Sequence, residues 1–340
     1  MKANDFPAIL GPVAPLQADP TVREIMVDAP DRVYLERDGQ IQEAGVRFDS
    51  PEAVRAMIDA VLAWNGLQVS VENPTAETRL PDGSRLVAVI SPTAVEGPYL
   101  VIRKADEPIL DWPRLIELGA ISAEAHALLL KALDYKLSIL VTGNMGSGKD
   151  TIVNLLAESL PADQRVIVVA NAYELPVHHP RRIHLEGGGP AKLSATQLLE
   201  TADKLRPDWL VLGNFQGAET MRAMQLLSGG HRAITTLYAT GPEDALTRLE
   251  TMCLMANLGL GLAEIRGLIA SAVRLITYQQ NHTLPDYRRK ITRIVEVLGL
   301  ENDRYMLQPL FTYNVDQGQL EATPARAGWE ERIRRGLTHG

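Results

Sequence analysis

The sequence predicts an α/β protein in which a small α+β domain precedes a larger domain with a parallel sheet. Two observations support this fold class. In the larger part, short apolar runs alternate with helical stretches, which is typical of a parallel sheet covered by helices on both faces. In the earlier part, short β-like runs surround one amphipathic helix. At 340 residues the chain is long enough for each domain to bury its own core.

Shifts in composition along the chain predict four parts. Residues 1–104 form the N-terminal α+β domain, and residues 105–113, which include two prolines and three acids, form a linker. Residues 114–300 form the parallel-sheet domain, and residues 301–340 form a C-terminal extension.

The composition argues against several classes of protein. A formal net charge of −8 does not fit a broad nucleic-acid surface. Cys253 is the only cysteine, so an intrachain disulfide and a four-cysteine zinc site are excluded, which fits a cytoplasmic protein. The chain opens without a signal-peptide pattern, and no stretch approaches the roughly 18 consecutive apolar residues of a membrane-spanning helix. We therefore expect any contact with the inner face of a membrane to run through partner proteins.

The first domain carries clear signals for a helix and a hairpin. Ser50 followed by Pro51 predicts a helix start, with serine as the cap and proline in the first turn. The apolar residues spaced to share one face of this helix are Val54, Met57, Ile58, Val61 and Leu62. The Pro-Asp-Gly turn at residues 81–83 predicts a hairpin between the extended runs on either side.

The second domain begins with a helix near residues 123–135 and then alternates strands with helices. The predicted strands cover residues 138–143, 165–170, 209–214 and 233–239, and one intervening helix covers residues 194–205. A mostly helical portion follows at residues 243–273, and a strand-like run follows at residues 291–300. This order is the basis for predicting a parallel sheet.

A glycine-rich stretch lies between the first strand of this domain and the next helix. It reads GNMGSGKD and matches the pattern of nucleotide phosphate loops, G-x-x-x-x-G-K-[ST], at both glycines and at the lysine. A strand before it and a helix after it bring backbone N–H groups and the positive helix end to one point, which is the geometry that binds phosphate. The predicted phosphate-binding residues are Gly143, Asn144, Met145, Gly146, Ser147, Gly148, Lys149, Asp150 and Thr151.

Asp150 stands where this pattern has the hydroxyl that holds Mg²⁺. A carboxylate in the first helical turn stabilises the helix end by roughly 0.3–1 kcal/mol, but it occupies the field that a phosphate would use. It can still serve as an oxygen ligand to a metal, whereas Thr151 is rotated by about 100° around the helix. Asp150 therefore weakens nucleotide binding without excluding it.

Further stretches extend the match beyond this loop. They are RPDWLVLGNFQGAETMRAMQLL, ITTLYATGPEDALTRLETMCLMANLGL and, in the first domain, EIMVDAPDRVYLERDGQI, RLPDGSRLVAVISP and GPYLVIRK. Together with the loop they resemble the TadA/CpaF branch of the type II/IV secretion-system ATPases, the motors of tight-adherence pilus assembly. The resemblance runs from about Asp19 to the tail and keeps its spacing throughout.

The resemblance implies an N-terminal α+β domain beside a RecA-like domain, with ATP bound between them and six subunits in a ring. It implies that arginines of the first domain reach the phosphates, and the matching positions here are Arg79, Arg85 and Arg103. Glu174 and Glu219 are also retained from the family pattern. The implied partners are sibling subunits, in a homo- or hetero-oligomer, and the inner-membrane platform proteins of a pilus or secretion machine, with no nucleic acid among them.

The chain departs from the family at the polar groups that handle water, metal and γ-phosphate. Besides Asp150, the departures are Ala170 and Asn171 for an acidic pair, Asn214 for the glutamate that orients water, Gln216 for an arginine, and Tyr238 for a histidine. His231 lies one place later than a family histidine. The framework residues, in contrast, match at 206–208, 235–236, 244–245 and 248–252. This selective loss predicts a pseudo-ATPase with no intact catalytic residue.

The cost of these losses is large for hydrolysis and smaller for binding. A positioned general base contributes about 10²–10⁴ in rate, and an arginine at the transition state about 10³–10⁵. Asn214 cannot accept a proton from water, so we expect hydrolysis to fall by several orders of magnitude. Backbone amides and Lys149 still favour phosphate, so ATP is expected to bind weakly. The sequence favours a site occupied by nucleotide and an empty site equally. Mg²⁺ is expected to be held poorly at Asp150, and no other metal site is predicted.

Two alternative functions stay open from the sequence. The first is an active hexameric ATPase whose site is rebuilt around Asp150, Glu174 and Glu219. The second is a small-molecule kinase, which has no support beyond the Asp150-Thr151 pair.

Two other groups of residues are interpreted as structural. The histidines at 178, 179 and 184 are interpreted as part of a surface connection, because adjacent histidines on an extended segment point to opposite faces. The apolar residues Leu254, Met255, Leu258 and Leu262 lie at helical spacing and are interpreted as core or subunit contact.

Overall fold

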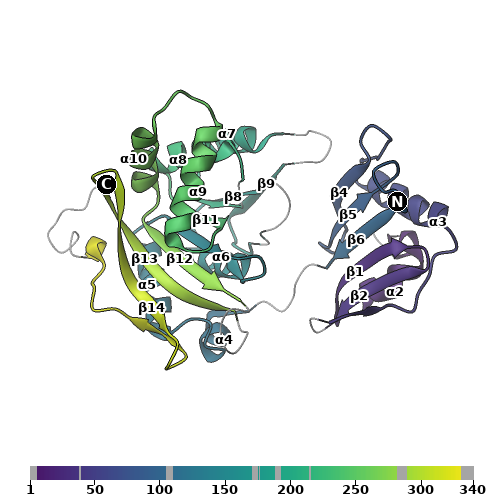
Figure 1. Ribbon diagram of the computed structural model, residues 1–340, viewed down its shortest axis with the longest axis horizontal. Helices are drawn as coiled ribbons and strands as arrows, with labels where there is room; N and C mark the ends of the chain where they lie inside the picture. The colour runs from purple at the N-terminus through teal and green to yellow at the C-terminus, as the bar shows by residue number, and fades with distance from the viewer. Residues whose placement is uncertain are drawn as a thin grey trace. The chain divides into compact units, whose positions relative to one another are not determined.

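The computed structural model describes residues 6–37, 40–104, 110–170, 175, 177–187, 193–213, 216–281 and 289–330. The chain divides into two compact units (Figure 1). The described residues up to 104 belong to the first unit, and those of the range 110–187 and from Leu193 onward belong to the second.

The first unit is a six-stranded antiparallel sheet with the strand order β3-β2-β1-β6-β5-β4. The strands are β1 (Val22–Ala29), β2 (Arg32–Arg37), β3 (Gln40–Glu43), β4 (Thr75–Arg79), β5 (Arg85–Val89) and β6 (Tyr99–Arg103). The helices are α1 (Phe6–Ile9), the 3₁₀ turn η2 (Gly11–Val13), α2 (Ala14–Ala18) and α3 (Pro51–Trp64). The predicted α+β character of this part is confirmed.

Helix α3 forms for the reasons read from the sequence. The Ser50 hydroxyl accepts a hydrogen bond from the Ala53 N–H at 3.3 Å, and Pro51 occupies the first turn. The helix buries the five apolar side chains that were predicted to share a face, Val54, Met57, Ile58, Val61 and Leu62. The hairpin is also confirmed, since β4 pairs with β5 and Gly83 in the turn has a φ of 89°.

The second unit contains a nine-stranded sheet with the order β15-β14-β13-β12-β7-β11-β10-β8-β9. Strands β7 (Ile139–Gly143), β8 (Val166–Ala170), β9 (Arg182–Glu186), β10 (Trp209–Leu212), β11 (Ala233–Tyr238) and β12 (Leu275–Gln280) run parallel. Strands β13 (Lys290–Glu301), β14 (Arg304–Asn314) and β15 (Gln319–Ala322) continue the sheet antiparallel. The parallel core matches the expectation, and the segment interpreted as an extension contributes β14 and β15 to the same sheet.

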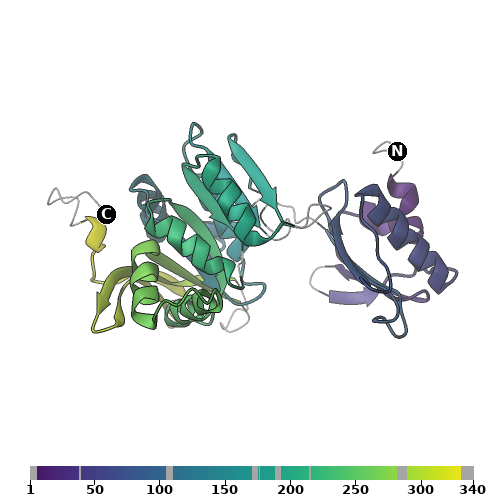
Figure 2. The same ribbon diagram turned by 90° about the horizontal axis from the view of Figure 1, so that it is seen from above.

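Helices cover both faces of this sheet (Figures 1 and 2). One face packs against α4 (Trp112–Glu117), α5 (Ala123–Asp134) and α6 (Lys149–Glu158). The other packs against α7 (Ala195–Lys204), α8 (Glu219–Ser228), α9 (Pro242–Met255) and α10 (Leu262–Ala272). Strand β7 shows the alternation that feeds both cores, because Ile139 and Val141 join the first and Leu140 joins the second.

The exposed apolar segment, formed by Leu254, Met255, Leu258 and Leu262, spans the end of α9, the connection after it and the start of α10, and it does not enter either core. Leu254 is 48% exposed, Met255 and Leu258 are each 59% exposed, and Leu262 is 39% exposed. The interpretation as core is therefore wrong, because α9 ends at Met255 and the four residues do not share one helix face. The interpretation as a subunit contact stays a prediction. Among the described residues, no helix has both the length and the apolar composition needed to cross a bilayer.

Cys253 lies on the buried face of α9, and burial raises the pKa of its thiol to about 12. At pH 8 we expect its thiolate fraction, and hence its rate with a thiol reagent such as DTNB, to be about a thousandfold below that of an exposed cysteine. The measurement compares the rate in buffer with the rate after unfolding in urea. Rapid reaction of one equivalent in the native protein would contradict this expectation.

Candidate functional site

The glycine loop, residues 143–150, joins the end of β7 to the start of α6. Gly148 caps α6 with a φ of 88°, and Gly146 has a φ of 71°, both in the left-handed region that favours glycine. Gly143 also leaves no room for a side chain, since a Cβ there would lie 2.4 Å from the carbonyl oxygen of Gln279. The expected strand, glycine turn and helix are all present, so the loop amides and the N-terminus of α6 lie together.

Lys149 is bound within its own chain. Its side chain is 4% exposed, and its Nζ donates a hydrogen bond to the carbonyl oxygen of Asn144 at 3.0 Å. The same Nζ lies 3.8 Å from the centre of the Tyr238 ring, in a cation–π contact. Such a contact contributes about 0.5–2 kcal/mol, with the higher values at desolvated sites like this one. The lysine of the loop is therefore held by a tyrosine at the position where the sequence departs from a histidine.

Asp150 lies in the first turn of α6, and its side chain is exposed. The cap residue Gly148 has no side chain to offer the helix, so Asp150 supplies the negative charge that favours this helix end. A phosphate bound at the same amides would meet that charge.

Strand β12 contributes residues to the loop that were not predicted from the sequence. Asn281, just after β12, donates from Nδ2 to the carbonyl oxygen of Met145 at 2.9 Å. Gln279 pairs with Gly143 in the parallel ladder and is 2% exposed, and its Nε2 has no hydrogen-bond partner among the described residues. These residues are found only from the strand order, because β12 lies beside β7 although the two are far apart in the chain.

The remaining strand ends meet the loop at the carboxyl edge of the parallel sheet. Tyr238 ends β11 and pairs with Gly143. Ala170 ends β8 and is buried, and a Cβ at Gly213, just after β10, would lie 2.9 Å from the Cβ of Ala170. The structure thus brings together Ala170, Gly213, Tyr238 and the glycine loop. The predicted positions Asn171, Glu174 and Asn214 lie outside the described residues.

Gln216 and Glu219 lie at the start of α8. The Oε1 of Glu219 accepts hydrogen bonds from the backbone N–H groups of Gln216 and Gly217, each at 3.1 Å. This arrangement orders the turn before α8, as a carboxylate in a first helical turn commonly does. Its role toward a nucleotide stays a prediction.

His231 does not approach the loop. It lies before β11, and its Nε2 is 3.0 Å from Oδ1 of Asp203, a carboxylate that also pairs with Arg222. The start of β11 is the amino-terminal edge of the parallel sheet, whereas the glycine loop follows the carboxyl end of β7. His231 therefore contacts α7 from the connection that leads into β11.

The three predicted arginines of the first unit form a row across its sheet. Arg79 pairs with Arg85 on β5, and Arg85 pairs with Arg103 on β6, so the three side chains share one face. Arg85 is held by Glu77, with 2.6 Å between Nε and Oε1. The register places these arginines beside one another, and their role in binding phosphate stays a prediction.

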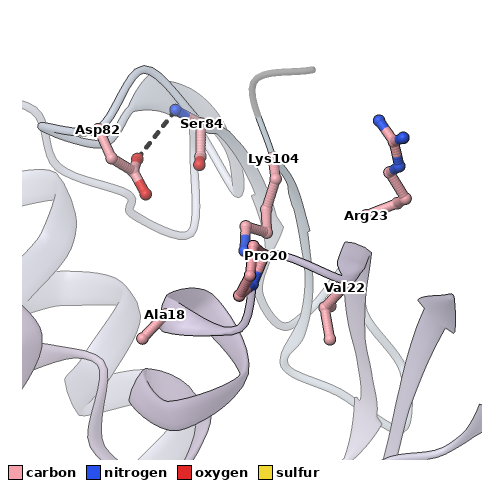
Figure 3. A pocket seen from close by; sticks show the side chains of 7 residues that line it. All are labelled: Ala18, Pro20, Val22, Arg23, Asp82, Ser84 and Lys104. Atoms are coloured by element: carbon pink, nitrogen blue, oxygen red, sulfur yellow. Dashed lines mark hydrogen bonds between the residues drawn. The ribbon is translucent and has the colours of Figure 1, made fainter. Parts of the chain in front are cut away.

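A pocket of about 270 Å³ in the first unit contains none of these arginines (Figure 3). It is lined by Ala18, Pro20, Val22, Arg23, Asp82, Ser84 and Lys104. Burial lowers the pKa of Lys104, opposed by the charges of Asp19 and Asp82, and its Nζ donates to the carbonyl oxygen of Asp19 at 2.6 Å. This pocket is a polar recess at the start of β1.

The histidines near β9 differ in burial, and His179 does not lie on the surface, where the sequence predicts it. The ring of His179 is fully buried, with Nε2 at 3.1 Å from the carbonyl oxygen of Pro161 and Nδ1 accepting from the Arg181 N–H at 3.2 Å. His178 is exposed, while His184 lies on β9. Within the described ranges, no group of three or more His, Cys, Asp or Glu side chains has the geometry to hold a metal ion.

Comparisons with known proteins bear on the origin of this site. The family described as "Type II/IV secretion system protein" matches residues 8–296. The type IV secretion system protein PtlH of Bordetella pertussis is 28% identical over 308 residues, covering 80% of this chain and 89% of the relative. The conjugal transfer protein TrbB of Rhizobium radiobacter is 24% identical over 295 residues, covering 85% of this chain and 88% of the relative.

A solved structure agrees in fold. The ATPase DotB of Legionella pneumophila superposes with a TM-score of 0.61 at 16% identity, covering 85% of this chain and 81% of that structure. At this identity the likeness concerns the α/β architecture, with its N-terminal antiparallel sheet and its larger sheet. Because the family match spans both units and most of the chain, the chain belongs to the type II/IV secretion system protein family.

Proposed function

We propose that this chain is a member of the TadA/CpaF branch that has lost ATP hydrolysis and acts as a structural or regulatory subunit of a type II/IV secretion or tight-adherence pilus machine. The observation that carries the proposal is the internal binding of Lys149, which has the Asn144 carbonyl and the Tyr238 ring as partners. In a hydrolysing phosphate loop this lysine reaches the β- and γ-phosphates. Here a nucleotide would have to compete with both contacts.

The carboxyl edge of the sheet adds to this argument. Ala170 offers no carboxylate where the family pattern has an acid, and Asn214 offers an amide where that pattern has the general base. A phosphate group would meet the amides that follow Gly146 and the N-terminus of α6, so the loop backbone fits a phosphate. The side chains around it do not supply a proton acceptor at the positions that the family uses. Weak binding of ATP without turnover is the outcome that this combination favours.

A site rebuilt around Asp150, Glu174 and Glu219 is the second candidate, and Glu219 is a member of this set that has well-defined contacts in the structure. That carboxylate already accepts two backbone hydrogen bonds in the turn before α8. These hydrogen bonds tie the carboxylate to the backbone of its own turn, so a catalytic role would require Glu219 to leave them. The first proposal requires no such rearrangement.

The proposed partners are sibling family subunits in a ring and the inner-membrane platform proteins of the machine. Support comes from the relatives, since PtlH is named as a type IV secretion system protein and TrbB as a conjugal transfer protein. The exposed apolar segment formed by Leu254, Met255, Leu258 and Leu262, between the end of α9 and the start of α10, is a candidate for contact between subunits.

The test is phosphate release from MgATP, measured with malachite green beside Legionella DotB as the reference ATPase. We expect this chain to release phosphate at least about 100-fold more slowly than DotB, the least that loss of a general base implies. In parallel, titration with a fluorescent ATP analogue should give weak binding that Mg²⁺ changes little, because Asp150 replaces the hydroxyl ligand. Turnover comparable with DotB would rule out the proposal.

A further inference from the structure

A second pocket, of about 470 Å³, lies at the amino-terminal edge of the parallel sheet. It is lined by Arg165, Arg181, Lys204, Leu205, Arg206 and Asp208, and we call it the basic pocket. Arg165 directly precedes β8, Arg181 precedes β9 and Asp208 precedes β10. Because these strands run parallel to β7, their starts lie at the edge opposite the glycine loop. The basic pocket is therefore separate from the predicted nucleotide site.

The lining carries an excess of positive charge. It contains four cationic side chains and one carboxylate, in a chain whose formal net charge is −8. The carboxylate of Asp208 accepts a hydrogen bond from the backbone N–H of Arg165 at 2.7 Å, so it is oriented by the main chain. Like charges gathered in one recess repel each other, and a bound anion would relieve that repulsion.

Backbone hydrogen bonds fix the segments from which these cations project. The carbonyl oxygen of Arg165 accepts from the N–H groups of Asp208 and Trp209 at 2.9 and 3.1 Å. The carbonyl oxygen of Arg181 accepts from the N–H of Val166 at 3.1 Å. These hydrogen bonds connect the N-terminal ends of β8, β9 and β10 to one another. The cationic side chains therefore extend from ordered backbone.

Helix electrostatics account for only part of this cluster. Lys204 is the last residue of α7 and Arg206 follows it closely, so both complement the negative end of that helix. Arg165 and Arg181 come from other segments. Arg181 donates from Nη1 to the carbonyl oxygen of Asp163, which uses one of its donors and orients its guanidinium. The Nε of Arg165 is buried and has no hydrogen-bond partner among the described residues, which is costly for a charged donor.

We propose that the basic pocket binds a ligand carrying two adjacent phosphate groups. Guanidinium groups bind phosphate oxygens in bidentate fashion, and the pocket offers three of them together with a lysine ammonium. Its volume of about 470 Å³ lies in the range of small-ligand sites and exceeds the space that one phosphate needs. The excess of three positive charges matches the charge of a diphosphate. Such a group belongs either to a soluble diphosphate or to a lipid headgroup, and it binds whether or not the chain hydrolyses ATP.

The test uses inorganic pyrophosphate and isothermal titration calorimetry on the full chain at low ionic strength. We expect the double variant Arg165→Gln/Arg206→Gln to bind pyrophosphate at least about tenfold more weakly than the unmodified chain, since each arginine contributes a charge-assisted contact. The matched control Arg114→Gln/Arg304→Gln removes two exposed arginines elsewhere in the same unit, and Lys149→Ala disables the glycine loop. The control Arg114→Gln/Arg304→Gln should bind pyrophosphate within about twofold of the unmodified chain. In the Lys149→Ala background, the double variant should still bind pyrophosphate at least about tenfold more weakly than Lys149→Ala alone.

Cosedimentation with vesicles distinguishes the two sources of the ligand. One set contains phosphatidylcholine with phosphatidylinositol bisphosphate, and the other contains phosphatidylcholine with phosphatidylserine at equal surface charge. Binding to the first set alone, lost in Arg165→Gln/Arg206→Gln, assigns the pocket to a lipid headgroup, and pyrophosphate binding without vesicle binding assigns it to a soluble ligand. If pyrophosphate gives no binding, or if the double variant binds it as the unmodified chain does, the proposal is overturned.

Discussion

Substitution of Asn214 by glutamate together with Asp150 by threonine is expected to raise phosphate release from MgATP by at least about 100-fold over the unmodified chain. The glutamate supplies a carboxylate that accepts a proton from the attacking water, which an amide cannot do. The threonine supplies the hydroxyl ligand for Mg²⁺ and removes a negative charge from the first turn of α6. The glutamate acts on the attacking water and the threonine acts on Mg²⁺. The increase in phosphate release from both changes together is therefore expected to exceed the increase from either change alone.

The matched control for this experiment is Asn214→Gln with Asp150→Ala, which alters the same positions without adding a base or a hydroxyl. It should leave phosphate release at the level of the unmodified chain. A third arm adds Tyr238→His, which removes the ring that lies 3.8 Å from Nζ of Lys149. If the double variant is no faster than the control even with this third change, the proposed loss of hydrolysis does not have its cause at these positions.

Replacement of Gly143 by alanine is expected to destabilise the protein by about 3 kcal/mol, the sum of overpacking and of strain at positive φ. The added Cβ would lie 2.4 Å from the carbonyl oxygen of Gln279 and 2.5 Å from Oγ of Ser147, and Gly143 has a φ of 156°. The clash with Gln279 involves backbone on the neighbouring strand β12, which cannot rotate away. The expected result is a fall in melting temperature of roughly 10 °C, measured by circular dichroism.

Gly299 provides the control for this prediction. Its φ of 137° is also positive, but a Cβ there would meet nothing within 4 Å. Gly299→Ala therefore carries the conformational cost alone, about 1–2 kcal/mol, and should lower the melting temperature less. Equal shifts for the two variants would show that the close contact between the glycine loop and β12 has no energetic consequence.

The elements that were predicted well have their causes in neighbouring residues. Helix α3 follows from the Ser50 cap and from the spacing of its buried apolar side chains, and the β4–β5 hairpin follows from the turn at residues 81–83. The order of strand, glycine turn and helix at residues 139–158 was predicted for the same reason. Local propensity and apolar periodicity decide such elements before any distant contact forms.

The parts that were missed depend on contacts between distant segments. The residues of β14 and β15 are rich in polar side chains and look like a tail, yet they complete the sheet by pairing outward from β13. The residues Leu254, Met255, Leu258 and Leu262 have helical spacing, but α9 ends at Met255 and α10 begins at Leu262, so they do not form one helix face. Periodicity indicates a helix, and only the tertiary structure decides where that helix ends.

The α/β class, the glycine loop and membership of the type II/IV secretion system protein family follow from the sequence by itself. Only the tertiary structure decided which side chains meet at the glycine loop. Strands β11 and β12 lie on either side of β7, so the Tyr238 ring meets Lys149 and the Asn281 amide meets the loop. The basic pocket likewise forms because the N-terminal ends of separate strands lie together at one edge of the sheet. The sequence shows which residue types are present. Electrostatic contacts depend on distances of a few ångströms between charged groups, and the order of the strands in the sheet sets those distances.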